Sequence, residues 1–419
     1  MRLFSLSLFL FVSVFVHAQA VTANDSAVLG AGTTQMVFYQ LSTGNKTVVS
    51  NTDWHLAITV RATQFPNAPL GGTTIRINEA NGVNAIYVPN ADAASFNSVD
   101  TTGWQAWTRL HDSDTAIDEG ALNSNRSSNI FDFGWGVYNS SSHNVVGDSL
   151  YLIQLPNGGL KKFMVVQLVK DTAFEIKYAN IDNSDLQTVY ISKKNYAGKQ
   201  FVYLNLLTNA VHDKEPLAAN WDLLFLKYAA NDVQPDTAYP VAGVWVNKNA
   251  SVAKAEGVNV NSNNYAGYSF SNRLNTIGWN WKEFNMQTFA YDVQDSLVYF
   301  VKTQAGLYYK VIFTGYSGGG SGIVRFYAEA LSSASGLYDA DRTGSIQLYP
   351  NPAQQIVVVE TETPASVLTI TDVSGRVVLS KPLLDTTEVL DVSALPNGMY
   401  AAVLSTNGKI ASKTFVVNR

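Results

Sequence analysis

The stretch LVYFVKTQAGLYYKVIF, residues 297–313, indicates the fold class of this chain. Two runs rich in aromatic and β-branched residues, 297–303 and 307–313, flank a short segment that ends in glycine. Such runs on either side of a short loop with glycine are typical of a β-hairpin. Because the runs are apolar on both faces, we expect these strands inside a sheet that is covered on both sides. No segment keeps a helical period long enough to require a major helix, so the sequence predicts an all-β protein.

Landmarks around this hairpin also occur earlier in the chain, which indicates an internal duplication. Four of them appear in the same order in both halves: WHLAI at 54–58 and WDLLF at 221–225, GW at 103–104 and 278–279, DSL at 148–150 and 295–297, and FEIKYA at 174–179 with IVRFYA at 323–328. The sequence therefore predicts two tandem antiparallel β-modules, at residues 21–190 and 191–331.

The first 20 residues have the pattern of an export signal. Arg2 precedes an apolar run at 3–16, and Ala-Gln-Ala at 18–20 fits the small-x-small rule for cleavage. The run is shorter than the roughly 20 residues that a membrane-spanning helix needs. We expect residues 1–20 to be removed, and we expect no transmembrane segment in the remaining chain.

Residues 346–419 form a third region, in which short apolar runs alternate with turns that contain glycine or asparagine. This pattern predicts a small antiparallel β-sandwich. A segment rich in small and polar residues, 332–345, precedes it and is predicted to be a linker.

Several spaced motifs lie in this third region: YPNP at 349–352, Asp372, GR at 375–376, LP at 395–396, GMY at 398–400 and Lys413. With these motifs the region resembles the C-terminal sorting domain of type IX secretion cargo in Bacteroidota. The resemblance implies a sorting signal carried by Pro350, Asn351, Pro352, Gly375, Arg376, Gly398, Tyr400 and Lys413. It also implies the type IX secretion machinery and a sortase-like protease as partners, and a location outside the cell or on its outer surface.

The two modules carry a second resemblance, through WDLLF at 221–225, the hairpin around Gly306 and the strand at 322–327. They resemble the HmuY-like haem-binding proteins of Bacteroidota, and the first module matches more weakly because Trp54-His55 replaces Trp-Asp. The resemblance implies a β-fold and haem as ligand, held in some members by two axial His or Met side chains. It also implies an outer-membrane haem receptor as partner.

The candidate haem ligands come from a segment that is longer in the first module than in the second. This segment lies between Trp104 and Asp148, and His111 and His143 lie in or beside it. It also holds several aromatic residues: Trp104, Trp107, Phe131, Phe133, Trp135 and Tyr138. Two imidazoles and apolar walls suit haem, so we predict His111 and His143 as iron ligands, with Trp104, Trp107 and Trp135 around the ring. The alternative is that both histidines are surface loop residues and the aromatics belong to the core.

Composition excludes several other classes of protein. Lysine and arginine number 28 against 33 aspartates and glutamates, for a formal net charge of -5, and no basic run occurs, which disfavours nucleic acid as a partner. The absence of cysteine excludes disulfides, thiolate metal sites and thiol nucleophiles. Four carboxylates at 112–119 lack the glycine of a calcium loop, so we do not expect Ca²⁺.

Two functional classes remain after these exclusions. No hydrolase, zinc-protease or phosphate-loop motif occurs, so we predict that the protein is not an enzyme. The first class is a secreted or cell-surface binding protein that captures haem. The second is a structural or adhesive β-sandwich protein that binds polysaccharide or protein at the cell surface.

Overall fold

Strands form the regular structure of the chain in the computed structural model, which describes residues 22–64, 69–234, 237–331, 346–361, 366–372, 376–383, 385–406 and 409–419. The helical segments within these ranges are short 3-10 turns: η1 (Ala31–Thr33), η2 (Pro69–Gly72), η3 (Glu79–Asn81), η4 (Ala93–Asn97), η5 (Trp104–Ala106), η6 (Ala121–Asn123), η7 (Lys193–Tyr196) and η8 (Ala218–Asn220). The all-β fold class is therefore confirmed.

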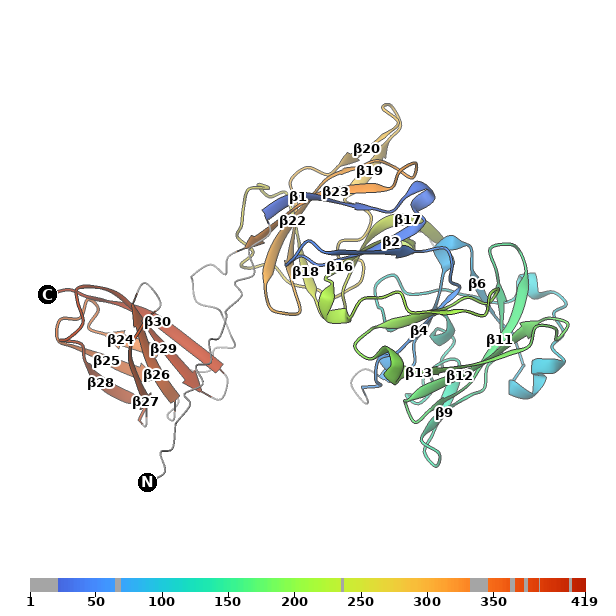
Figure 1. Cartoon of the computed structure of the whole chain (residues 1–419), viewed down its shortest axis with the longest axis horizontal. Helices are drawn as coiled ribbons and strands as arrows, with labels where there is room; N and C mark the ends of the chain where they lie inside the picture. Colours follow the sequence, from blue (N-terminus) through green and yellow to red (C-terminus); the bar gives the residue numbers. More distant parts are fainter. Residues whose placement is uncertain are drawn as a thin grey trace, which may run out of the picture. The chain divides into compact units, whose positions relative to one another are not determined.

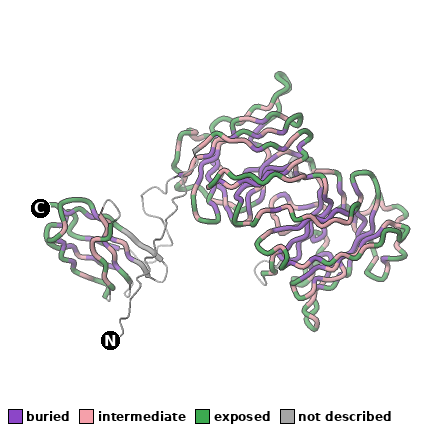
Figure 2. The backbone as a smooth tube through the Cα atoms, in the orientation of Figure 1, coloured by how far each residue is buried: buried purple, intermediate pink, exposed green. Residues whose placement is uncertain are grey.

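The chain divides into two compact units, Met1–Leu331 and Ser332–Arg419. In each of them the buried residues follow the strands, and exposed residues gather in the connecting loops (Figure 2). The expected export signal at 1–20 and the expected linker at 332–345 lie outside the described residues.

The first unit contains a β-sandwich that we call the inserted sandwich, formed by strands between residues 56 and 212. Its larger sheet has the order β13-β12-β11-β10-β6-β7, and β8 and β9 join it through β11. These strands are β6 (Asn84–Tyr87), β7 (Arg109–Leu110), β8 (Gly136–Asn139), β9 (Asn144–Gly147), β10 (Tyr151–Gln154), β11 (Leu160–Val169), β12 (Ala173–Asn180) and β13 (Gln187–Ser192). The smaller sheet consists of β15 (Val211–His212), β14 (Phe201–Leu204), β4 (Leu56–Thr59) and β5 (Ile75–Ile77), in that order.

Alternation along the strands fills the core of the inserted sandwich. Successive side chains of a strand point to opposite faces of the sheet. In β12, Phe174, Ile176 and Tyr178 therefore share one face, and all three are buried in the core between the two sheets.

The second sandwich is made from two separate parts of the chain, so we call it the split sandwich. Its larger sheet has the order β1 (Thr22–Val28), β23 (Ile323–Leu331), β22 (Tyr308–Tyr316), β21 (Leu297–Lys302) and β18 (Ser251–Glu256). Its smaller sheet has the order β17 (Thr237–Val246), β16 (Leu223–Gln234), β2 (Gln35–Tyr39) and β3 (Lys46–Ser50). A further hairpin consists of β19 (Lys282–Asn285) and β20 (Ala290–Val293).

The hairpin predicted from residues 297–313 is formed by β21 and β22, and it lies inside the sheet as expected. Tyr299 and Phe313 face the core between the two sheets of the split sandwich. Phe300 and Ile312 face the opposite side, where a second apolar cluster covers them. The strands are apolar on both faces because both faces are covered.

Strand pairing does not follow the expected boundary between residues 190 and 191. β1 pairs with β23, and β2 pairs with β16, so residues 22–50 belong to the split sandwich (Figure 1, blue strands beside orange and green ones). β14 pairs with β4, so residues 201–212 belong to the inserted sandwich. The inserted sandwich therefore lies within the chain of the split sandwich, because long-range pairing places strands that local motifs do not.

The landmarks WHLAI at 54–58 and WDLLF at 221–225 meet where the two sandwiches contact each other. Leu56 lies in the core of the inserted sandwich, and Leu223 lies in the core of the split sandwich. Trp54, Trp221 and Leu224 point the other way, into one shared cluster of buried apolar side chains. We call this cluster the junction, and it joins the sandwiches through the outer faces of their smaller sheets.

The second unit forms the small antiparallel sandwich that the sequence predicts. One sheet consists of β24 (Ile346–Tyr349), β25 (Ile356–Thr361) and β28 (Thr387–Asp391). The other has the order β27 (Val377–Leu383), β26 (Ser366–Asp372), β29 (Gly398–Thr406) and β30 (Lys409–Val417). An apolar core that includes Leu368, Ala402 and Phe415 lies between them.

Candidate functional site

His143 lies beside an apolar pocket of the inserted sandwich. The pocket has a volume of about 410 Å³, which is within the range of small-molecule sites. We call it the aromatic pocket, and its lining consists of Thr63, Thr73, Phe131, Phe133, Tyr138, His143, Val145, Leu168, Lys170 and Asp171. It combines three aromatic rings and two aliphatic side chains with an imidazole, the ammonium of Lys170 and the carboxylate of Asp171.

The turn between β8 and β9 positions the imidazole at this pocket. The backbone N–H of His143 donates to the carbonyl oxygen of Asn139 at 2.8 Å, and the φ angle of His143 is 60°. The hydroxyl oxygen of Tyr138 lies 2.8 Å from Nδ1 of His143. The Tyr138 ring stacks on Phe131, with 5.8 Å between ring centroids. The ring of His143 is thus held at one nitrogen although the residue is exposed.

Strand pairing forms the opposite wall of the aromatic pocket. β9 pairs with β11, and Val145 lies directly across from Leu168. The next turn brings Lys170 and Asp171 to the rim, and both residues have positive φ angles. The pocket therefore depends on three elements that are separate in the sequence: the β8–β9 hairpin, the end of β11 and the loop after β4.

The structure does not bring His111 and His143 into one pocket. Nδ1 of His111 contacts the carboxylate of Glu79, and this hydrogen bond raises the pKa of His111. His111 lines a different cavity, next to Asp112 and Asn231, and none of the residues around that cavity also lines the aromatic pocket. We therefore assign the two histidines to separate sites.

The three tryptophans of the sequence prediction do not line the aromatic pocket. Trp135 is fully buried in the core, and its Nε1 donates to the carbonyl oxygen of Thr73 at 2.7 Å. Trp104 and Trp107 pack on the outer face of the larger sheet, near Phe96. Their positions are structural, and Phe131, Phe133 and Tyr138 are the aromatics at His143.

Sequence reasoning missed the residues that come from distant strands. Val145 and Leu168 are ordinary strand residues, and Thr63 lies in a loop that is far from the β8–β9 hairpin in the sequence. No local motif indicates that these residues meet. The only available signal was the aromatic content of residues 131–138, next to His143.

The carboxylates near His111 have separate partners. Asp112 accepts hydrogen bonds from the backbone N–H groups of Ile77 at 3.1 Å and Ala121 at 2.7 Å, and burial raises its pKa to about 6. The other three contact different groups: Asp114 the backbone N–H of Asn231, Asp118 the cations Arg61 and Lys248, and Glu119 the guanidinium of Arg126. Within the described ranges, no group of three or more His, Cys, Asp or Glu residues is arranged to hold a metal ion.

Two of the predicted sorting residues, Asn351 and Tyr400, make contacts that support the sandwich of the second unit. Asn351 accepts a hydrogen bond from the backbone N–H of Val416 at 2.9 Å. Tyr400 is buried and donates to the carbonyl oxygen of Pro396 at 2.8 Å. The remaining residues lie at the surface or in turns: Pro350 and Pro352 between β24 and β25, Arg376 paired with Asp372, Gly398 at the start of β29, and exposed Lys413 on β30. Gly375 lies outside the described residues.

Residues 347–418 match the family described as the secretion system C-terminal sorting domain. This match supports type IX secretion cargo of Bacteroidota and implies interaction with the type IX machinery. The protein is accordingly exported to the extracellular space or the outer cell surface. In the part of the chain that the structure describes, no helix is long and apolar enough to cross a membrane.

Other comparisons are distant, and no curated protein matches the sequence. PorZ, an essential surface component of the type IX secretion system of Porphyromonas gingivalis, is 13% identical over 67% of this chain, with a TM-score of 0.17. This chain covers 44% of that protein. The four N-terminal Ig domains of Dscam1 are 10% identical over 72% of this chain and 62% of theirs, with a TM-score of 0.15. The BSP domain of a biofilm-associated protein is 13% identical over 97% of this chain and 68% of its own, also with a TM-score of 0.15. TM-scores this low carry no argument about fold or function.

Proposed function

We propose that this exported chain is a non-enzymatic binding protein that captures a flat, largely apolar ligand, with haem as the specific candidate, in the aromatic pocket. The observation that carries the proposal is the placement of His143 beside Phe131, Phe133 and Tyr138 at a pocket of about 410 Å³. The resemblance of the modules to HmuY-like proteins points in the same direction. An outer-membrane haem receptor as recipient is part of this proposal.

The pocket offers one imidazole, that of His143, which would hold a haem iron. When Nδ1 of His143 donates to the Tyr138 oxygen, Nε2 carries the lone pair that would bind a haem iron. The aromatic and aliphatic lining would cover the faces of the ring, and the Lys170 ammonium at the rim would pair with a ring carboxylate. His111 has no part in this site, because the Glu79 carboxylate holds its Nδ1 in another cavity.

A haemin titration of the full chain, followed by visible absorption, tests the proposal. We expect a saturable shift of the Soret band in the wild-type chain. His143→Ala should weaken binding at least about 10-fold, as for the loss of one ligand interaction of roughly 1.4 kcal/mol or more. Tyr138→Phe should weaken it less, because it removes only the support of the imidazole.

His111→Ala is the matched control, and it should bind haemin like the wild type. The absence of a saturable shift in the wild-type chain would reject haem capture and favour an adhesive protein. Equal binding by folded His143→Ala, with an unchanged melting temperature, would reject the assigned ligand.

A further inference from the structure

A second cavity, rich in cations, lies where the inserted and split sandwiches meet. It has a volume of about 480 Å³, and we call it the basic cleft. Five of its lining residues carry a positive charge: Arg61, Lys193, Lys194, Lys199 and Lys248. Four of them belong to the inserted sandwich, and Lys248 follows β17 of the split sandwich.

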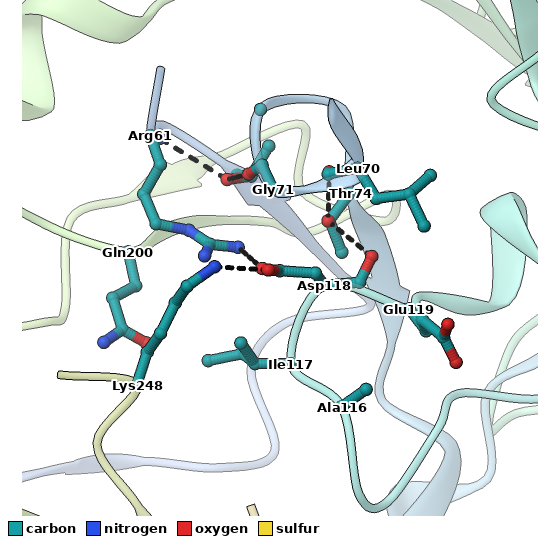
Figure 3. Close-up of polar contacts among 12 residues, drawn as sticks. Arg61, Leu70, Gly71, Thr74, Ala116, Ile117, Asp118, Glu119, Gln200 and Lys248 are labelled. Carbon is teal, nitrogen blue, oxygen red and sulfur yellow. Dashed lines mark hydrogen bonds and ion pairs between the residues drawn. The ribbon is translucent and has the colours of Figure 1, made fainter. Parts of the chain in front are cut away.

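One carboxylate joins the two sides of the basic cleft (Figure 3). Nη2 of Arg61 lies 2.5 Å from Oδ1 of Asp118, and the ammonium of Lys248 contacts Oδ2 of the same carboxylate. Burial alone would raise the pKa of Asp118, but the neighbouring cations Arg61 and Lys248 lower it below its usual value. A single anion is thus shared by two cations from the two sandwiches.

The guanidinium of Arg61 retains unused hydrogen-bond donors. Its Nε and Nη1 are buried and have no hydrogen-bond partner among the residues that the structure describes. The group lies over the ring of Phe201, with 5.6 Å between the guanidinium carbon and the ring centroid. Buried donors without acceptors are unfavourable, so this group favours a bound acceptor.

The cations of the basic cleft also repel one another. Burial lowers the pKa of Lys248, and the positive charge of Arg61 lowers it further. Burial is also the largest cause that lowers the pKa of Lys193, and Arg61 contributes in the same direction. In the described part of the chain, the five cations of the cleft stand against four carboxylates, because Asp118, Asp171 and Asp213 pair with cleft cations and Glu215 interacts with Arg61. Positive charge is thus in excess by one here, although the chain as a whole has a formal charge of -5. A bound oxyanion would relieve this repulsion.

We propose that the basic cleft binds an acidic sugar unit of an extracellular polysaccharide, a ring that bears a carboxylate or a sulfate. The cations suit the oxyanion, and the side-chain amide of exposed Asn249 suits a hydroxyl group. The apolar lining is limited to small side chains: Val60, Ala62, Ala197 and Ala218. No aromatic ring of the described residues lines the basic cleft, so it does not favour the flat ligand proposed for the aromatic pocket. The two sites are independent proposals.

Calorimetric titration of the full chain tests this second site with four probes: a sulfated disaccharide, a galacturonate disaccharide, a neutral disaccharide and inorganic sulfate. We expect at least one acidic disaccharide to bind, with an affinity that falls as salt increases, and the neutral one not to bind. Lys248→Gln should weaken binding about 10-fold or more, and exposed Lys194→Gln about 3-fold. Lys254→Gln is the control, because Lys254 pairs with Glu256 outside the cleft and should leave binding unchanged.

Two results would overturn the binding site itself, and a third would overturn the sugar as its ligand. One is that neither acidic disaccharide binds the wild-type chain. The other is that Lys194→Gln and Lys248→Gln, both with unchanged melting temperatures, bind like the wild type. Inorganic sulfate that binds as tightly as the disaccharides would reject the sugar and leave a site for free anions. Haemin binding by the same variants should be unchanged, so failure here is distinguishable from failure at the aromatic pocket.

Discussion

Asp222 shows how a single buried carboxylate connects the two parts of the split sandwich. It precedes β16, and its Oδ2 accepts a hydrogen bond from the backbone N–H of Leu41, beyond the end of β2, at 2.8 Å. Burial raises its pKa from 3.8 to about 6. The charged form is therefore less favourable in the folded chain than in the unfolded one.

This shift predicts a specific dependence of stability on pH. The folded chain binds the proton of Asp222 more tightly than the unfolded chain, so this group lowers stability as pH rises through about 4 to 6. Asp222→Asn, which keeps an acceptor oxygen, should raise the unfolding free energy at pH 8 by up to about 3 kcal/mol and leave it unchanged below pH 4. Thermal unfolding measured across this pH range checks the prediction, with exposed Asp295→Asn as the control. A lower stability of Asp222→Asn at pH 8 would contradict it.

Residues of the candidate site were predictable only where they are close in the sequence. His143 and its aromatic neighbours Phe131, Phe133 and Tyr138 lie within one short stretch, so composition alone placed them together. The predicted pairing of His111 with His143 could be checked only in the tertiary structure, which places the two histidines at separate cavities. The contact of His111 with Glu79 comes from a different turn, which no spacing reveals.

At the scale of elements, the aromatic pocket depends on the close approach of β9 to β11. Gly147 ends β9, and a Cβ atom at this position would overlap the carbonyl oxygen of Val165. The absence of a side chain allows the β8–β9 hairpin to lie against the larger sheet. The hairpin in turn carries Tyr138 and His143.

Gly147→Ala should therefore disturb the pocket without changing any residue that lines it. We expect a loss of about 1–3 kcal/mol in unfolding free energy, as for overpacking, and weaker haemin binding. Gly319→Ala is the matched control, because a Cβ there would meet nothing within 4 Å. Denaturant unfolding and the haemin titration measure both effects. Wild-type stability and haemin affinity in Gly147→Ala would show that the hairpin does not hold the pocket.

Elements with short-range pairing were predictable, and those with long-range pairing were not. The β21–β22 hairpin and the small sandwich of residues 346–419 follow from alternation and turn residues next to each other in the chain. β1 and β23 are separated by most of the first unit, so the sequence pattern of β1 holds no information on its partner.

At the scale of the whole molecule, the insertion of one sandwich into the other changes which segments can fold alone. Residues 52–215 contain the strands and core of the inserted sandwich. Residues 191–331 lack β1, β2 and β3, which complete both sheets of the split sandwich. The boundaries of independent folding should therefore follow strand pairing rather than the sequence repeat.

Two fragments test this arrangement. We expect residues 52–215 to unfold in a cooperative thermal transition, because their core is complete. We expect residues 191–331 to show none, because the loss of β1 and β2 exposes the apolar faces of their neighbours β23 and β16. Circular dichroism on heating distinguishes the two cases. A cooperative transition in residues 191–331 alone would contradict the pairing described above.

We propose His143 as the protein ligand for haem at the aromatic pocket. The most direct measurement is the electron paramagnetic resonance spectrum of the haemin-saturated full chain, compared with the spectra of His143→Ala and His111→Ala. We expect the signature of a nitrogen ligand to the iron in the wild type and in His111→Ala, and its loss in His143→Ala. A signature that persists in His143→Ala, or that disappears in His111→Ala, would contradict it.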